Sequence, residues 1–196
     1  WLAAPKGAKE FTLLHAGGKI RRVGLILPNA NGVYDQVEIY KNKKSSEPLV
    51  IAGLDEFVQD VLDEAYCGEE LIVVNRNMRV LEIAEDGSAL KMWVSAGMDF
   101  HNNTLWHPRT LLEDIVEHVG YPQPICTAAG SDKRLISQCV HANWTAAAHW
   151  NAESIKYLAK TGGYEVIFSH FHNVDLQGHL LVKFLKQGSE KVQAET

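Results

Sequence analysis

The sequence has few cysteines, no long apolar run and no excess of basic residues. Its three cysteines, Cys67, Cys126 and Cys139, lie far apart with no Cys-x-x-Cys spacing, so we predict free thiols and a reducing, cytoplasmic compartment. No stretch approaches the roughly 20 apolar residues of a membrane helix, and we expect neither a secretory leader nor a membrane partner. A formal net charge of -5 argues against a nucleic-acid polymer as partner, because phosphate backbones are met by clustered Lys and Arg.

The sequence also lacks the glycine motifs that cradle phosphates. Neither Gly-x-Gly-x-x-Gly nor Gly-x-x-x-x-Gly-Lys-Ser/Thr follows a predicted strand, which excludes the dinucleotide and P-loop classes. The 196 residues have 46% hydrophobic and 22% charged side chains, the ordinary composition of a folded protein. Because the chain opens at Trp1 and not at Met, we expect a processed protein or an internal segment of a longer one.

The first half of the chain has the pattern of an antiparallel β module. Short β-rich runs alternate with turn signals such as "AGG", "PNANG" and "EDGSA". Strands are predicted at "FTLLH", "KIRRVGLIL", "YDQVEIY", "PLVIA", "EELIVVNRNMRVLEIA" and "ALKMWV". One interruption, residues 54–68, has apolar residues at helical spacing and a terminal glycine, so we predict an amphipathic helix there.

The second half changes to helical and α/β texture after Gly97. Helices are predicted at residues 107–122 and from about 135 to 160, then a buried strand at "YEVIFSH" and a short helix at "DLQGHLLVKFLKQG". We therefore expect an α+β fold, in which an antiparallel β-rich module with one or two helices is followed by a helix-strand-helix piece of an α/β layer. The predicted domains are residues 1–98 and 99–196, with a seam at 97–107.

Three imidazoles and a carboxylate follow the apolar run "YEVIF", at His170, His172, Asp175 and His179. If a helix begins at Asp175, then Asp175 and His179 are neighbours on one face and can clasp one cation. Their oxygen and nitrogen donors suit zinc, with manganese or iron as substitutes. Gly178 lets substrate or backbone approach without a Cβ.

The other two histidines take a lesser part in this interpretation. His170 and His172 alternate along an extended segment, so we expect them to face opposite sides and to contact either the metal-binding side chains or the substrate, without binding the metal themselves. Two ligands do not close a zinc site, and Asp175 is also a good helix N-cap. Trp106 in "DFHNNTLWHP" is a candidate for stacking on a base or sugar, although turn preferences favour a linker there.

The stretch "YEVIFSHFHNVDLQGH" resembles the alkaline phosphatase superfamily, in its type I phosphodiesterase and nucleotide pyrophosphatase branch. There a hydrophobic strand runs into an Asp-x-x-Gly-His signature whose Asp and His bind one of two catalytic metal ions, commonly zinc. The resemblance implies this role for Asp175 and His179, with Gly178 as the signature glycine. It extends more weakly to "WNAESIKYLAKTGG" and "LWHPRTLLEDIVEHVGYPQP", and it implies that the β module is a cap inserted over the site.

The chain departs from this family in its missing nucleophile and remaining ligands. Asp99 with Thr104, and Ser131 beside Asp132, do not follow a buried strand as the family nucleophile does. We therefore predict part of a metal-dependent phosphohydrolase for a small phosphorylated substrate. The isolated chain should be inactive and should self-associate through its C-terminal half. The alternative is a non-catalytic binding or interaction module in which Asp175 is only a helix cap.

Overall fold

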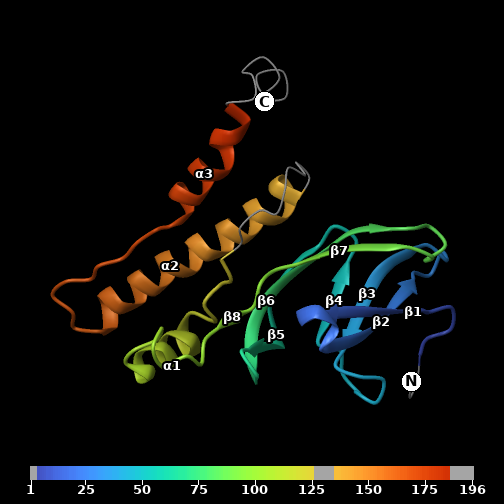
Figure 1. The fold of residues 1–196 in the computed structure, drawn as a ribbon, viewed down its shortest axis with the longest axis horizontal. Coiled ribbons are helices and arrows are strands. Elements are labelled where there is room, and N and C mark those ends of the chain that lie inside the picture. Colours follow the sequence, from blue (N-terminus) through green and yellow to red (C-terminus); the bar gives the residue numbers. More distant parts are fainter. Residues whose placement is uncertain (1–3, 126–134, 186–196) are drawn as a thin grey trace. The chain divides into compact units, whose positions relative to one another are not determined.

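The chain folds into two units, residues 1–125 and 126–196. The structure is a computed structural model that describes residues 4–125 and 135–185; Figure 1 shows its strands and helices in chain order. The first unit contains all the described strands and one α-helix, and the second contains helices. The α+β class predicted from the sequence is confirmed.

The first sheet is an antiparallel meander. Its strands are β1 (Lys9–His15), β2 (Ile20–Pro28), β3 (Tyr34–Tyr40) and β4 (Val50–Gly53), and each pairs with its neighbour in the chain. A single turn of 3-10 helix, Ala16–Gly18, joins β1 to β2. These four strands match the predicted runs, because alternating apolar residues and short turns favour local antiparallel pairing.

The second sheet is built around one long strand. β6 (Glu70–Ile83) pairs antiparallel with β5 (Phe57–Cys67), with β7 (Leu90–Val94) and with the short β8 (Met98–Asp99). The predicted strands at β6 and β7 are confirmed.

The two sheets of the first unit share one hydrophobic core. Val37 and Ile39 of β3 contribute from the first sheet, and Met78 and Val80 of β6 contribute from the second. All four side chains are at most 2% exposed. Burying a side chain of this size is worth about 1.5–3 kcal/mol, so this core can hold the sheets together without disulfides.

The amphipathic helix predicted over residues 54–68 is wrong, because this segment forms β5. A bulge between Val58 and Val61 displaces the strand register, and Asp60 there has a φ of +59°. The bulge separates the apolar pairs at 57–58 and 61–62, which imitates helical spacing. The inward-facing position 63 holds a carboxylate instead of an apolar side chain. The alternation of apolar and polar residues that marks a strand is therefore interrupted in the sequence.

The first unit extends beyond the predicted seam at residues 97–107. The helix α1 (Arg109–His118) forms as predicted, and Gly120 ends it with a φ of +111°. The helix α1 was expected in the second domain but belongs to the first unit, and so does β8, which lies across the predicted boundary between residues 98 and 99.

Buried amides hold the end of this unit against the sheet. Asn75 and Asn77 of β6 are fully buried; the Asn75 amide donates to the Pro122 carbonyl at 3.1 Å, and the Asn77 amide to Gln123 Oε1 at 3.0 Å. Gln123 Nε2 then donates to Asp60 Oδ1 at 2.7 Å. The unit therefore ends after this segment.

The described part of the second unit is helical. A π-helical turn, Leu135–Val140, leads into α2 (His141–Thr161), and α3 (Asn173–Leu185) follows a loop. The helices predicted here are confirmed. None of the helices in the described ranges is long and apolar enough to cross a bilayer.

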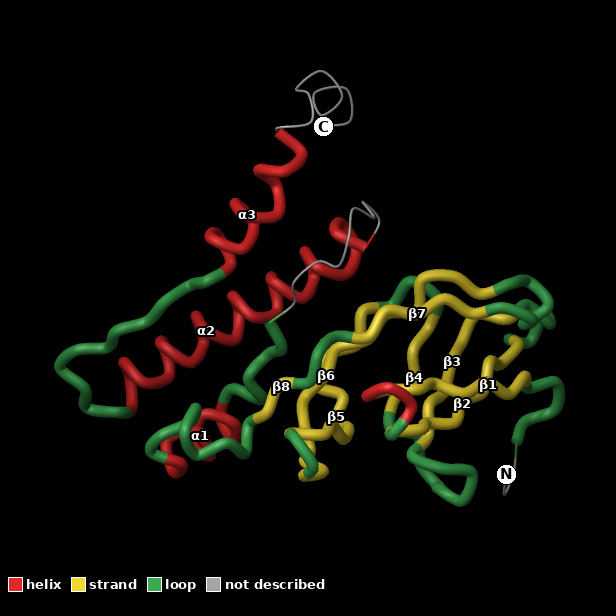
Figure 2. The backbone as a smooth tube through the Cα atoms, in the orientation of Figure 1, coloured by secondary structure: helices red, strands yellow, loops and turns green. Residues whose placement is uncertain are grey.

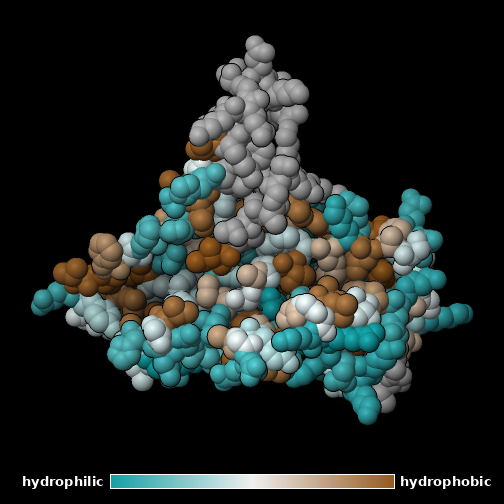
Figure 3. All heavy atoms as spheres, viewed as in Figure 1, coloured by the Kyte–Doolittle hydropathy of each residue, from teal (hydrophilic) through white to brown (hydrophobic). Residues whose placement is uncertain are grey.

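The buried strand predicted at residues 164–170 does not form. Figure 2 draws this segment as loop, and Val166 and Phe168 are 84% and 94% exposed. Hydrophobic residues gather over this α2–α3 loop in Figure 3. A strand needs a partner for its backbone N–H and C=O groups, and no described strand pairs with this segment. The sequence is apolar enough for a strand, but the pairing that defines one is absent from the described residues.

Candidate metal centre

The candidate site lies at the first turns of α3. The Leu176 amide donates to the His172 carbonyl at 3.0 Å, which makes His172 the N-cap residue of the helix. Asp175 is therefore the third helical residue and does not occupy the N-cap position considered from the sequence. Asn173 Nδ2 donates to the Trp144 carbonyl of α2 at 2.7 Å and ties the start of α3 to that helix.

Asp175 and His179 face each other across one helical turn, as their spacing predicts. His179 Nε2 lies 3.3 Å from Asp175 Oδ1, and the two side chains are 79% and 51% exposed. Both donors are thus accessible to an ion or substrate from solvent.

His172 also contacts Asp175, which the sequence analysis missed. Its Nε2 lies 3.5 Å from Asp175 Oδ2. The expectation that His170 and His172 face opposite sides is wrong: their ring centroids are 5.0 Å apart, with the rings at 76°. The strand alternation assumed for these residues does not apply, because the chain is already turning into α3.

Gly178 sits in the helix between the two predicted ligands. A Cβ placed on it would meet no heavy atom within 4 Å in the part of the chain that the structure describes. No contact among the described residues requires a glycine at this position, although glycine destabilises a helix interior by about 1 kcal/mol relative to alanine. The open space is what an approaching ligand or segment would need.

Trp106 and the two nucleophile candidates are not brought to this site by any described contact. The Trp106 indole donates to the Asp99 carbonyl at 2.7 Å within the first unit, which agrees with a structural role in the turn. The Thr104 amide donates to Asn102 Oδ1 at 2.8 Å in the same turn. Cys126, Ser131 and Asp132 lie outside the described residues.

The donor set fits one side of a zinc site. A carboxylate and an imidazole within one turn are the oxygen and nitrogen donors that zinc accepts. Within residues 4–125 and 135–185, no group of three or more His, Cys, Asp or Glu side chains is arranged to hold a metal. Asp175 and His179 by themselves would hold an ion weakly, and a closed zinc site would need further ligands.

A second Asp and His pair on α1 has the same spacing. His118 Nδ1 lies 3.4 Å from Asp114 Oδ1, and both side chains are 47% exposed. His118 Nδ1 also contacts the Asp114 carbonyl at 2.9 Å. Ion pairs at i, i+4 are common on helix surfaces, so spacing alone does not identify a metal site and this pair serves as a matched control.

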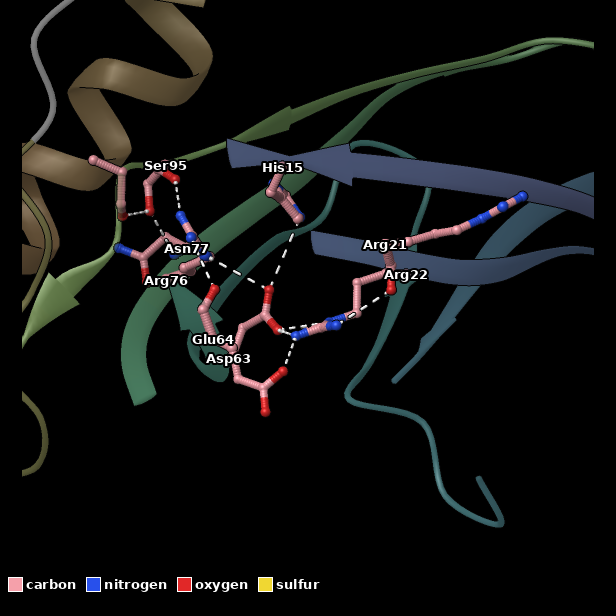
Figure 4. Close-up of polar contacts among 9 residues, drawn as sticks. His15, Arg21, Arg22, Asp63, Glu64, Arg76, Asn77 and Ser95 are labelled. Carbon is pink, nitrogen blue, oxygen red and sulfur yellow. Dashed lines mark hydrogen bonds and ion pairs between the residues drawn. The ribbon is translucent and has the colours of Figure 1, made fainter. Parts of the chain in front are cut away.

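The first unit contains a buried ionic cluster that the sequence analysis did not predict. Asp63 of β5, which is 3% exposed, lies between side chains from three other strands (Figure 4). Arg22 Nη2 of β2 is 2.6 Å from Asp63 Oδ1 and 2.7 Å from Glu64 Oε2. Arg76 Nε of β6 is 3.6 Å from Asp63 Oδ2. Two guanidinium groups thus face two carboxylates.

His15 of β1 also belongs to this cluster, and its pKa is changed by its surroundings there. Its Nε2 lies 3.9 Å from Asp63 Oδ2. Burial and the positive charge of Arg76 lower the pKa of His15 below its ordinary value, and the opposing effect of Asp63 is smaller. The two guanidinium groups balance the two carboxylates, which favours a structural role for the cluster.

Comparison with protein-family models, curated proteins and solved structures finds no significant match to this chain.

Proposed function

We propose that this chain supplies part of the catalytic site of a metal-dependent phosphohydrolase acting on phosphodiesters or nucleotide pyrophosphates. The observation that carries the proposal is the Asp175 and His179 pair, whose donor atoms lie 3.3 Å apart at the exposed start of α3. The open space at Gly178 and the resemblance of residues 164–179 to the Asp-x-x-Gly-His segment support it.

In this proposal Asp175 and His179 hold one ion of a two-metal zinc centre, with manganese or iron as substitutes. A bound zinc ion would polarise a phosphoryl oxygen and lower the pKa of a nucleophile. The nucleophile and the other ligands come from segments outside this chain. The β-rich unit takes the role of the cap that the resemblance implies, and the substrate is a small phosphorylated molecule. The free thiols of Cys67 and Cys139 favour a reducing compartment.

The proposal is tested in the complete protein that contains this chain by Asp175→Ala and His179→Ala. We expect each variant to lose bound zinc, measured by elemental analysis, and to hydrolyse bis-p-nitrophenyl phosphate at least about a hundredfold more slowly, because the metal supplies several kcal/mol of charge stabilisation. The matched control is Asp114→Ala with His118→Ala, which removes an equally spaced surface pair and should change neither quantity.

Wild-type metal content and activity in both Asp175→Ala and His179→Ala would refute the metal assignment. The 196-residue chain alone should not turn over the same substrate, because two ligands without a nucleophile cannot complete the reaction. Sustained hydrolysis by this chain would place the nucleophile within it.

A further inference from the structure

Two imidazoles flank the carboxylate of Asp175, one at each oxygen. His179 Nε2 faces Oδ1 at 3.3 Å from one turn along the helix, and His172 Nε2 faces Oδ2 at 3.5 Å from the residue that caps it. The carboxylate is thus contacted from both sides, and the two histidines do not compete for one oxygen.

The backbone and ring of His172 are each held by a neighbour. Its carbonyl accepts the first hydrogen bond of α3, from the Leu176 amide at 3.0 Å. Its ring meets the ring of His170 nearly edge to face, with centroids 5.0 Å apart. The next residue, Asn173, is bonded to the Trp144 carbonyl of α2. Nε2 of His172 is therefore presented to Asp175 from a fixed helix start.

We propose that His172 is a positioning residue that hydrogen-bonds Asp175 Oδ2 and so keeps Oδ1 directed to the metal side shared with His179. This inference rests on the proposed function. Carboxylates that bind metals are commonly held by such outer hydrogen bonds, whose loss weakens metal affinity about 10–100-fold. The role requires the Nε2–H tautomer of His172, while the His179 nitrogen that takes the metal must give up its proton.

The experiment titrates the 196-residue chain with Zn²⁺, from micromolar to millimolar concentration, and follows the imidazole ¹⁵N resonances by NMR. In the wild-type chain we expect His179 to change to the metal-bound state while His172 keeps its proton on Nε2. His172→Ala should weaken Zn²⁺ binding at His179 about tenfold. His172→Gln places an amide N–H near the position of Nε2 and should restore most of the affinity.

His172→Asn separates positioning from helix stability. Asparagine is a better N-cap than histidine or glutamine, but its amide is too short to replace Nε2. A positioning role therefore predicts weak Zn²⁺ binding with an intact or strengthened α3. If His172 acts only as the N-cap, Zn²⁺ binding should stay at the wild-type level, because asparagine keeps the helix intact. Circular dichroism of each variant reports the helix, and His118→Ala on α1 is the control that should leave binding unchanged.

Other outcomes would overturn the positioning role of His172. Wild-type affinity in His172→Ala would overturn the positioning role and leave the proposed function standing. Loss of the Nε2 proton of His172 on adding Zn²⁺ would show a ligand instead of a positioning residue. No Zn²⁺-dependent change at His179 in the wild-type chain, or an equal change at His118, would overturn this inference, whereas the metal assignment itself is decided by the zinc content of the complete protein.

Discussion

Asp63 and Glu64 are adjacent in β5, yet they serve different environments. Asp63 points between the sheets to Arg22 and Arg76, while Glu64 also pairs with the half-exposed Lys41 at 2.6 Å. Removing one partner of a buried ion pair commonly costs about 3–5 kcal/mol, whereas an exposed pair contributes about 0–1 kcal/mol. The buried pairs therefore fix how β2 and β5 face each other, and the pair with Lys41 adds little.

We expect the chain to lose stability as the pH falls below about 6.5, and His15→Gln to reduce this loss. Burial and Arg76 lower the pKa of His15 in the folded chain, so the unfolded chain binds more protons in this range and is favoured by acid. The lowered pKa of Glu64, caused first by its hydrogen bond from Lys41, affects stability only around and below its ordinary 4.5. Urea unfolding between pH 7 and about 5 measures the His15 effect.

The control for this prediction is His118→Gln on the exposed face of α1, which should leave the pH dependence unchanged. A His15→Gln chain with the full acid sensitivity of the wild type would show that another group carries it.

At the scale of elements, the sequence predicts strands and helices well where local pattern decides them. The strands of the first sheet and the helices α1 and α2 follow from turn signals and apolar spacing. β5 does not, because its bulge imitates a helical period and its buried Asp63 accepts a hydrogen bond from Arg22, 41 residues away. The segment 164–170 has the composition of a strand but lacks a partner among the described strands.

In the candidate site, too, contacts set by local spacing could be predicted, and contacts set by the start of the helix could not. The pairing of Asp175 with His179 follows from i, i+4 spacing and could be predicted. The contact between His172 and Asp175 could not, because it depends on the residue at which the loop becomes helix. That residue is set by the hydrogen bonds at the helix start. A prediction based on strand alternation does not take these hydrogen bonds into account.

For α3 we predict that Gly178→Ala stabilises the helix while impairing the phosphohydrolase activity proposed for the complete protein. Alanine is favoured over glycine in a helix interior by about 1 kcal/mol, and its Cβ meets no described atom. If Gly178 leaves room for substrate, the same methyl group should raise KM or lower kcat. Circular dichroism melting of the chain and steady-state kinetics of the complete protein measure the two effects.

Val182→Ala, elsewhere in α3, provides the control because it changes an exposed side chain outside the Asp-x-x-Gly-His segment. It should leave the kinetics unchanged. Full activity in Gly178→Ala would remove the argument from open space and leave the metal ligands to be judged separately.

At the scale of the whole molecule, the exposed apolar residues of the α2–α3 loop lead us to predict self-association of the chain. Tyr164, Val166 and Phe168 are 49%, 84% and 94% exposed and occupy alternate positions. Contiguous apolar surface of this kind favours association. We expect the chain to self-associate as its concentration rises, and Val166→Ser with Phe168→Ser to shift it towards monomer in sedimentation velocity.

The matched control replaces Leu14 and Ile51 by serine, two exposed apolar residues of the β-rich unit at 59% and 49%. Because these belong to the other unit, the double variant should associate like the wild type. A wild-type chain that stays monomeric at high concentration would contradict the prediction.

The hydrogen bonds of Gln123 and its neighbour Pro122 also determine how far the chain can be shortened without loss of contacts to the sheet. A shortened chain that stops at residue 98 would lose the bonds from Asn75 to Pro122 and from Asn77 to Gln123. A hydrogen bond of this kind contributes about 0.5–1.5 kcal/mol to stability. A chain that stops after Ile125 keeps both. The portable module, the piece that could be grafted onto another protein with its fold intact, is therefore residues 4–125 and not the two sheets alone.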